Sequence, residues 1–518
     1  MSAINRVIIN TGVTYAKALI KALIALYSTR VVLNALGASD YGMYNVIGGM
    51  IALLAFLNAA MTISTQRYIS FNLGRGNIIN IKKIFANSVV IHYVVGFILV
   101  IGIEIIGTYL IHHKLKIDPE RVQVAGYILH FVVISTFITV ISVPYDAVIN
   151  AHENMTFLAI VGVIESVLQL MVALSLVFLS GDKLFYYGLF SMATVIIVRI
   201  IKQIYSRKKY EECSVSLKEE FDKEQIKELS SFAGWQLFGT LCALGRNQGV
   251  AVVLNIFYGT IVNAAYGISN QINSQLMFFS QTMMSAVRPQ IMKSEGANER
   301  KRMIRLALTA NKFSFYLFTF FALPFFFTMP FVLKLWLKHV PHFSVEFCRA
   351  IILLTMMNQI NMGLMTAVQA IGKIKVYQMV AGGIQLLTLP IGIVFLKLGF
   401  PPQSIILVSF VLETISTVFR MFYFNHLTGY PVIDYFKNVI LSSFLSLLPT
   451  AILVYFINGQ FSNSWINLIV VFSASGLSYL IAIYFIGLDD NDKLMFERLY
   501  QSFRNKLSRK SKSNEKTA

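Results

Sequence analysis

Charged side chains are scarce in this chain of 518 residues, of which 13% are Asp, Glu, Lys or Arg and 56% are hydrophobic. Soluble globular proteins carry about 25% charged residues, because polar groups must cover their surfaces. The shortage excludes an array of water-soluble domains. Acidic residues are the scarcer kind, with 25 Asp and Glu against 44 Lys and Arg, which gives a net charge of +19.

Cysteine and proline are also scarce, with 3 and 11 residues. Cys213, Cys242 and Cys348 lie far apart and form no CxxC motif, so neither a disulfide framework nor a metal site is predicted. The sequence contains no GxxxxGK[ST] loop, no HExxH and no nucleophile elbow, the motifs of ATP binding and of two hydrolase classes. We therefore expect no cofactor, no metal and no enzymatic activity.

Long hydrophobic runs are abundant instead. A helix that crosses a bilayer needs about 20 mostly apolar residues, and this criterion selects about fourteen candidate spans. The expected fold class is an all-α polytopic membrane protein. The spans are predicted at residues 12–35, 41–63, 85–110, 122–145, 155–180, 184–204, 231–255, 261–287, 313–337, 346–370, 376–398, 404–425, 436–458 and 465–487.

Lysine and arginine mark one side of these spans. The loops on the side of the two termini hold most of them, and the loops on the other side hold few. Cytoplasmic loops are the ones that collect Lys and Arg, so both termini are predicted to be cytoplasmic. The same rule accounts for the positive net charge, and we expect no nucleic acid partner.

An internal repeat divides the chain into two halves. Residues 31–34 and 252–255 both have the sequence VVLN, and residues 41–47 (YGMYNVI) match residues 266–272 (YGISNQI). Six spans in each half make a parallel repeat, with the substrate path between the lobes. The expected organisation is an N-lobe (1–205), a cytoplasmic linker (206–228), a C-lobe (229–427), two further helices (428–488) and a basic cytoplasmic tail (489–518).

Charged residues within the spans are the candidates for function, because a charge in the bilayer is costly and usually faces a cavity or a partner. The first span contains Lys17, Lys21 and Arg30. Lys21 lies near the predicted midplane and shares a helix face with Lys17, which suits a multivalent anion such as a pyrophosphate. Lys17 and Arg30 are further candidates for binding pyrophosphate, although they lie nearer the span ends, where they could instead reach the interface. Arg246 could hold phosphate oxygens bidentately or pair with a buried carboxylate such as Glu165.

Two roles remain open for Glu165, whose counterpart in the repeat is Gln385. It could bind a coupling proton or cation, or it could neutralise a lysine of the first span. Glu413 and Arg420 lie two turns apart on one helix face. They are predicted to form a structural ion pair.

The end of the first span resembles a known family. Arg30 precedes an apolar run, and residues 36–42 (LGASDYG) lead into the second span. This pattern resembles the Wzx-type polysaccharide flippases of the multidrug/oligosaccharidyl-lipid/polysaccharide exporter superfamily. Residues 144–151 (PYDAVINA) and the layout of two six-helix lobes plus two helices are similar to these flippases as well.

The resemblance implies a flippase of the bacterial inner membrane that works by alternating access. Its substrate would be an undecaprenyl-pyrophosphate-linked oligosaccharide, such as an O-antigen, capsule or exopolysaccharide repeat unit, moved from the inner to the outer leaflet. Lys17, Lys21 and Arg246 would be the cavity cations, Asp40 a gate residue, and residues 428–488 a groove for the lipid tail. Sugar hydroxyls would meet dispersed polar residues: Asn58, Gln169, Asn270, Gln271, Asn358 and Gln369.

The expected partners are this lipid-linked substrate, the bilayer, and polysaccharide polymerase and chain-length machinery. A coupling ion, H⁺ or Na⁺, would act through Glu165 or Asp40. One alternative is an ion-coupled multidrug or organic-cation antiporter of the same fold, which should have twelve spans and more buried carboxylates than buried cations. Another is a membrane-embedded glycan polymerase or ligase, which should have a larger outer loop. A structural scaffold would not easily explain Lys21.

Overall fold

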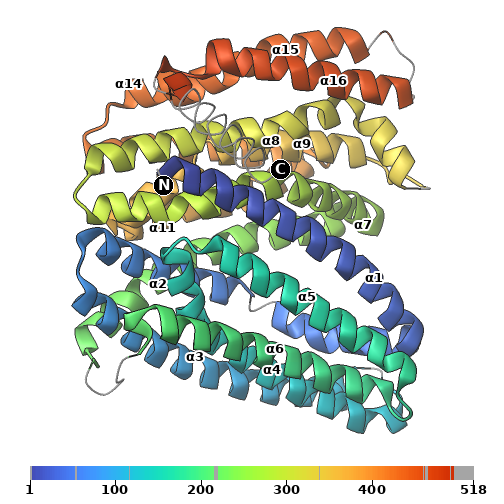
Figure 1. Ribbon diagram of the computed structural model, residues 1–518. Helices are drawn as coiled ribbons and strands as arrows, with labels where there is room; N and C mark the ends of the chain where they lie inside the picture. Colours follow the sequence, from blue (N-terminus) through green and yellow to red (C-terminus); the bar gives the residue numbers. More distant parts are fainter. Residues whose placement is uncertain are drawn as a thin grey trace, which may run out of the picture. The chain divides into compact units, whose positions relative to one another are not determined.

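The computed structural model describes residues 3–52, 55–115, 117–214, 220–337, 339–458, 460, 465–490 and 492–494. Most of the predicted tail and residues 215–219 of the predicted linker lie outside these ranges. The described chain is almost wholly helical (Figure 1). Its main helices are α1 (Ala3–Ala52), α2 (Ala55–Arg75), α3 (Ile78–His113), α4 (Val122–Ala151), α5 (Met155–Phe178), α6 (Lys183–Lys209), α7 (Lys223–Gly296), α8 (Arg300–Trp336), α9 (Ser344–Gln359), α10 (Met362–Ile371), α11 (Ile374–Leu386), α12 (Thr388–Lys397), α13 (Ser404–Thr428), α14 (Val432–Tyr435), α15 (Ser442–Asn458) and α16 (Trp465–Ala482).

Within the described chain, 12 helical segments are long and apolar enough to cross a membrane. Fewer segments are found than the fourteen expected because some predicted spans are joined into one helix or divided between two. The spans expected at 231–255 and 261–287 both belong to α7, and the span expected at 41–63 is divided between α1 and α2. The all-α polytopic fold class is confirmed.

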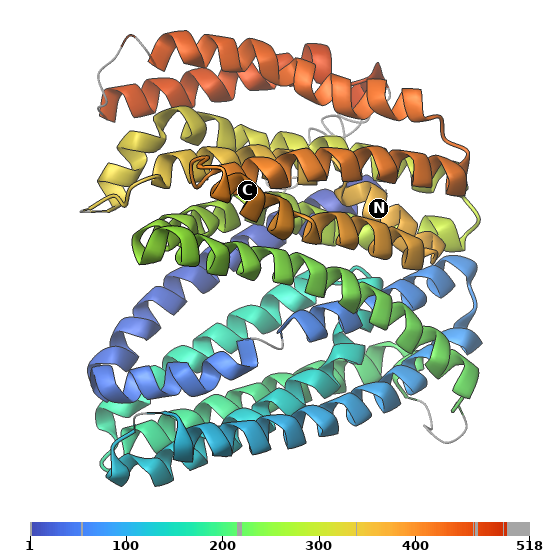
Figure 2. The ribbon, with the colours of Figure 1, turned by 180° about the vertical axis from the view of Figure 1, so that it is seen from behind.

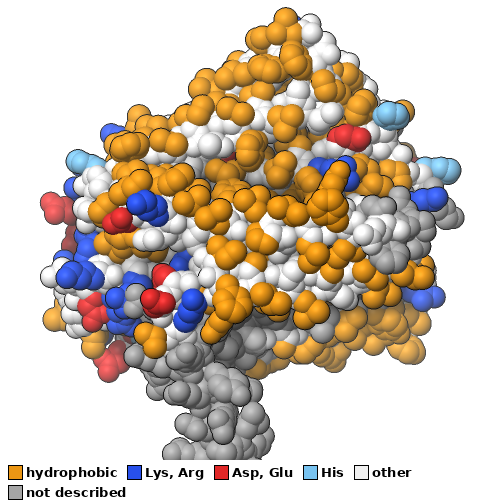
Figure 3. Space-filling model, turned by 90° about the horizontal axis from the view of Figure 1, so that it is seen from above, with side chains coloured by type: hydrophobic (Ala, Val, Ile, Leu, Met, Phe, Trp, Pro, Cys, Tyr) orange, Lys and Arg blue, Asp and Glu red, His pale blue; other side chains and the backbone are white. Residues whose placement is uncertain are grey.

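Large hydrophobic side chains are exposed along these helices, among them Phe178, Ile256 and Phe485. Figure 3 shows one face of the molecule, where hydrophobic side chains cover most of the middle and charged ones gather toward the edges. A soluble monomer rarely exposes apolar patches beyond a few hundred Å². The protein is therefore a multi-pass membrane protein, whose exposed apolar side chains face lipid.

The chain forms two compact units. The N unit contains Ile9–Thr240 and Met292–Asn298. In this unit α3, α4 and α6 lie side by side (Figures 1 and 2). Gly107 of α3 and Gly188 of α6 face Leu129 and Ile128 of α4, and a Cβ at either glycine would overlap these side chains. Small residues at such contacts let membrane helices approach closely.

The C unit contains residues 3–8 at the start of α1, Leu241–Ile291 and the described residues from Glu299 onward. Here α8 packs against α9 and α10 on one side and against α15 and α16 on the other (Figures 1 and 2). The second contact is aromatic, with ring centroids of Phe325 and Phe472 5.1 Å apart and those of Phe331 and Trp465 5.8 Å apart. These last two helices belong to the segment predicted to form the lipid groove, and their outer faces expose apolar residues.

Two glycines bend the long helices α1 and α7. Gly37 has φ 77° and ψ 170°, and Gly259 has φ 77° and ψ −170°. Both follow the repeated sequence VVLN by three or four residues, so the two halves carry the same backbone turn next to the same motif. This region of φ/ψ space is essentially limited to glycine.

Gly259→Ala is expected to lower the stability of the protein by about 2 kcal/mol, the cost of forcing an alanine into this conformation. No heavy atom lies within 4 Å of the position that a Cβ would take at Gly259, so the effect would come from backbone strain and not from a clash. Thermal unfolding in detergent measures it. Gly267→Ala is the control, because Gly267 has ordinary helical backbone and equal space around it; an equal loss in both variants would contradict the prediction.

Candidate functional site

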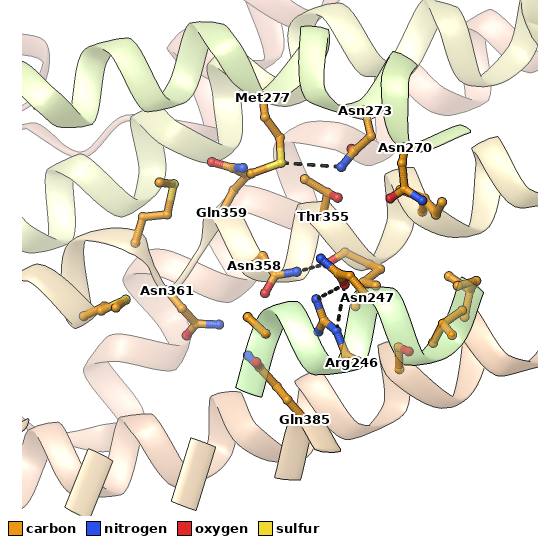
Figure 4. Close-up of a pocket in the computed structure, with 18 of the residues that line it drawn as sticks. Arg246, Asn247, Asn270, Asn273, Met277, Thr355, Asn358, Gln359, Asn361 and Gln385 are labelled. Atoms are coloured by element: carbon orange, nitrogen blue, oxygen red, sulfur yellow. Dashed lines mark hydrogen bonds between the residues drawn. The ribbon is translucent and has the colours of Figure 1, made fainter. Parts of the chain in front are cut away.

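A polar cavity of about 330 Å³ lies within the C unit, among α7, α9, α10, α11 and α13 (Figure 4). We call it the amide cavity because carboxamide side chains dominate its polar lining. No Asp or Glu is among the described residues that line it. The polar side chains of the lining are Arg246, Asn247, Tyr266, Asn270, Asn273, Thr355, Asn358, Gln359, Asn361, Tyr377, Gln385, Ser409 and Arg420.

An interrupted helix supplies the centre of this lining. The span expected at 346–370 is two helices, α9 and α10, which separate at Ile360 and Asn361. The Asn361 side chain donates to the carbonyl of Met357 at 3.0 Å and to Thr417 Oγ1 at 2.8 Å. Asparagine competes in this way with the hydrogen bonds of a helix. Asn358 and Gln359 of α9 and Asn361 at the break line the same cavity.

Asn311 of α8 stabilises the break from outside the cavity lining. Its Oδ1 accepts from the backbone N–H of Gly363 at 2.6 Å and from that of Leu364 at 3.3 Å. Its Nδ2 donates to Tyr435 Oη at 3.0 Å, and this hydroxyl donates to the carbonyl of Ile360 at 2.8 Å. Irregular backbone at membrane depth needs such partners, because lipid offers none.

Several amide atoms of the cavity have no protein partner. Gln359 is 0% exposed, yet neither its Nε2 nor its Oε1 is hydrogen-bonded to a described residue. The same holds for the Oδ1 atoms of Asn273 and Asn361. Buried polar side chains are nearly always hydrogen-bonded. These atoms therefore retain hydrogen-bonding capacity for a molecule that enters the cavity.

Among the described residues, Arg246 is the cation of the amide cavity that has no ion-pair partner. Its Nε and Nη2 donate to Oδ1 of Asn247 at 3.2 and 3.1 Å (Figure 4). No described carboxylate forms an ion pair with it. Of the two roles left open by the sequence, the pair with Glu165 is absent here, because Glu165 pairs with Lys21.

Arg420, the other arginine of the lining, is neutralised. It forms an ion pair with Glu413, and both side chains are almost completely buried. The guanidinium also lies over the ring of Tyr377, 5.7 Å from its centroid. The predicted Glu413–Arg420 pair is confirmed, and it leaves the net charge of the cavity to Arg246.

The N unit has a larger cavity, of about 630 Å³, which we call the hydroxyl cavity. None of the described residues that line it is charged. Lys17, Lys21 and Arg30 are not among them. Its polar lining consists of Ser28, Thr29, Tyr41, Tyr44, Asn45, Ser135, Thr136, Thr139, Gln169, Tyr187 and Ser191.

Lys21 lies one helical turn from this hydroxyl cavity. Its Nζ is 3.3 Å from Glu165 Oε2, and the two side chains are 45% and 34% exposed. Ala25 and Gln169, which line the cavity, are the i+4 neighbours of these two residues, so they share the same helix faces. The contact is the arrangement in which Glu165 neutralises a lysine of the first span.

Lys17 lies against α5, the helix that carries Glu165. Its side chain passes over Gly162 of α5, where a Cβ would overlap it. Nearby, Lys202 Nζ is 2.7 Å from Asp146 Oδ1. Lys17 therefore belongs to a group of charges in the N unit, in which it has no ion-pair partner among the described carboxylates.

Asp40 and Arg30, the remaining candidates, lie in different surroundings. Arg30 is exposed and forms no ion pair with a described residue. Asp40 is 8% exposed and pairs with Arg121, which also pairs with Asp182. Asp182 Oδ1 additionally accepts from the first backbone N–H groups of α6. This cluster joins the bend of α1 to the loops before α4 and α6.

Burial raises the pKa of the Asp40 carboxyl, against the opposing effect of Arg121. Removing a carboxylate from water disfavours its charged form. The ion pair with Arg121 favours that charged form. Asp40 is thus a carboxyl whose protonation is linked to the packing at this end of the N unit.

Only some of the amides that were expected to contact sugar hydroxyls line a cavity. Asn270 and Asn358 line the amide cavity, and Gln169 lines the hydroxyl cavity. Asn58, Gln271 and Gln369 line neither. Sequence reasoning missed Gln359, Asn361 and other amides of the cavity, although residues 358–361 (NQIN) place three amides within four residues of an apolar span.

The described residues contain no group of His, Cys, Asp and Glu that could hold a metal ion.

Solved structures of transporters resemble this fold closely. A MATE transporter in the bent conformation matches with a TM-score of 0.71 at 12% identity, over 82% of this chain and 96% of that chain. A MATE family multidrug resistance transporter of the MOP superfamily, in an outward-facing conformation, matches with a TM-score of 0.66 at 14% identity and the same coverage. A MOP superfamily transporter from Pyrococcus furiosus, described by a binding pocket of reverse polarity that suggests a different function, has a TM-score of 0.67 at 14% identity, again over 82% and 96%.

No family model matches the sequence, and no curated protein matches it. At this level of identity the structural likeness establishes the fold. The chain has the fold of the MATE transporters of the MOP superfamily. It is a multi-pass membrane protein with this fold.

Proposed function

We propose that the protein is a flippase that moves an undecaprenyl-pyrophosphate-linked oligosaccharide from the inner to the outer leaflet of a bacterial inner membrane. The observation that carries the proposal is the amide cavity, which combines one unpaired cation, many amides and no lining carboxylate among the described residues. Arginine binds phosphate oxygens well. Amides donate to and accept from hydroxyl groups. The cargo that fits is anionic at one point and rich in hydroxyls elsewhere.

The same observation weighs against an organic-cation antiporter. A carboxylate is the direct counter-charge for a cationic cargo, and the described linings of the amide and hydroxyl cavities contain none. One of the structural neighbours is described by a pocket of reverse polarity, so the fold alone does not decide the charge of the cargo. The polymerase or ligase alternative gains no support, because the fold is that of transporters.

The proposal extends to residues and partners that follow from the resemblance. Lys17, Lys21 and Arg246 are proposed to bind pyrophosphate, and Asp40 and Glu165 to take part in gating or in coupling to H⁺ or Na⁺. Transport proceeds by alternating access, with both termini in the cytoplasm and the helices of 428–488 in contact with the lipid tail. Polysaccharide polymerase and chain-length proteins would receive the product.

Reconstitution in liposomes tests the proposal. The purified protein is placed in vesicles with a fluorescent undecaprenyl-pyrophosphate oligosaccharide, and the fraction of glycan that reaches an external glycan-cleaving enzyme is followed over time. We expect wild type to accelerate its appearance relative to empty vesicles. A parallel assay with ethidium, a lipophilic cation, tests the antiporter. Ion-driven ethidium transport without glycan movement would overturn the flippase.

Lys21→Ala is expected to slow glycan transport at least about tenfold, the effect of losing one charge-assisted hydrogen bond to phosphate. The double variant Lys21→Ala/Glu165→Gln distinguishes two explanations of the slower transport, a lost contact with substrate and an unpaired Glu165. If Lys21 contacts substrate, the double variant stays as slow as the single one. If Lys21 only neutralises Glu165, removing the unpaired carboxylate restores transport, and Lys21 is then no substrate ligand.

A further inference from the structure

The side chains that line the amide cavity differ in how far they are exposed to solvent. Gln359 is fully buried, whereas Arg246 and Asn247 are partly exposed. Figure 4 shows Gln359 near Met277 and Asn273, with Arg246 and Asn247 on another part of the lining. The cavity therefore has a charged, accessible part and an uncharged, buried part.

The lining of the cavity offers both unsatisfied donors and unsatisfied acceptors. Gln359 has both an unpartnered Nε2 and an unpartnered Oε1, and Asn273 and Asn361 each add an unpartnered Oδ1. A hydroxyl group is both donor and acceptor, so it can satisfy either kind of atom. Among the described lining residues, a cation would find no carboxylate and an anion would find no second free cation. The chemistry that fits is neutral and hydroxylated.

The site is also rigidly built. Gln359 ends α9 at the break, and Asn311 and Tyr435 fix that break from the far side. Gly363, at the start of α10, lies so close to the backbone of Ala307 that a Cβ would overlap its carbonyl. Preorganisation of this kind lowers the entropic cost of binding. The volume of about 330 Å³ is at the lower end of small-molecule sites.

From these contacts we infer that the amide cavity is a saccharide subsite, which takes the sugar ring joined directly to the pyrophosphate. Arg246 contacts the phosphate, and Gln359 selects the sugar through a hydrogen-bonding substituent. The link to pyrophosphate rests on the proposed function, whereas recognition of the sugar ring rests on the buried amides alone. A hydrogen-bonding site discriminates strongly against a ligand that leaves its polar groups unpaired.

Binding of free sugars tests this inference without lipid or transport. The full-length protein in nanodiscs is titrated with the methyl glycosides of glucose, galactose, rhamnose, N-acetylglucosamine and N-acetylgalactosamine, with saturation-transfer NMR as the readout. We expect at least one of these sugars to bind wild type. Gln359→Met should weaken its binding about tenfold. The melting temperature of the unliganded variant should not fall, because an apolar side chain of similar shape replaces an unpartnered amide.

Gln403→Met is the matched control. Gln403 is in the same unit and its Oε1 is likewise buried without a partner, but it does not line the cavity. This variant should bind the sugar as wild type does. The inference is overturned if no sugar of the panel binds wild type, or if Gln359→Met binds it as tightly as wild type. An equal loss in both variants also overturns it.

The outcomes for the subsite and for the flippase can be told apart. If sugars bind in a manner that depends on Gln359 but no lipid-linked glycan is moved, the subsite stands and the flippase fails. If glycan is moved and Gln359→Met does not change the preference between two first sugars, the flippase stands and the subsite fails. The glycosides and the liposome assay are therefore both needed.

Discussion

Arg246→Ala should reduce the rate of glycan transport by about 100-fold. Truncating one partner of a desolvated, hydrogen-bonded charge pair costs about 2–5 kcal/mol, and about 1.4 kcal/mol corresponds to tenfold. Among the described residues of the amide cavity, Arg246 is the cation without an ion-pair partner, since Glu413 pairs with Arg420. Initial rates in the liposome assay measure the loss.

Two further variants sharpen this experiment. Arg246→Lys keeps the charge but loses the planar fork that binds two phosphate oxygens, so its rate should lie between those of wild type and Arg246→Ala. Arg349→Ala is the control, because Arg349 is in the same unit but does not line the amide cavity and instead donates to the carbonyl of Phe326 at 3.0 Å. Transport by Arg246→Ala at the rate of Arg349→Ala would remove Arg246 from the mechanism.

Asn311→Leu should destabilise the protein by about 2–5 kcal/mol. The change leaves two buried backbone N–H groups without acceptors, those of Gly363 and Leu364, and each unsatisfied buried group costs about 1–3 kcal/mol. The loss should appear as a lower melting temperature in detergent. Because α9 and α10 form the cavity, the substitution should also reduce binding of sugars.

Tyr435→Phe provides the graded comparison for Asn311. It removes the hydroxyl that donates to the carbonyl of Ile360 but leaves the Asn311 Oδ1 contacts in place. The expected cost is about 1–2 kcal/mol, smaller than that of Asn311→Leu because no backbone donor is left unpaired. A larger effect of Tyr435→Phe than of Asn311→Leu would contradict this account of the break.

The sequence predicted the membrane fold because a membrane span can be recognised from the hydrophobicity of its own residues. It also predicted the Glu413–Arg420 pair, since residues two turns apart share one helix face and two long side chains of opposite charge can reach each other there. It did not predict the break between α9 and α10. The break depends on Asn311, Thr417 and Tyr435, which come from other helices.

The candidate site was predictable only in part. Lys21 and Arg246 were identified because an intramembrane cation is conspicuous in any sequence. Their partners were not identifiable, and Glu165 could have paired with either of them. The structure places Glu165 beside Lys21 and leaves Arg246 with Asn247. Amides such as Gln359 carry no charge and so give a weak signal, although they form the most buried part of the cavity.

The sequence alone shows that the chain crosses a membrane many times, and its repeats predict that two related halves make up most of it. Both properties are local, because hydrophobicity and repetition can be read along the chain. The tertiary structure is needed to tell which polar side chains have a partner within the protein and which have none. That distinction depends on residues brought together from distant helices, as at the break between α9 and α10, where Asn311 of α8 accepts from the backbone of α10 beside the amides that line the cavity.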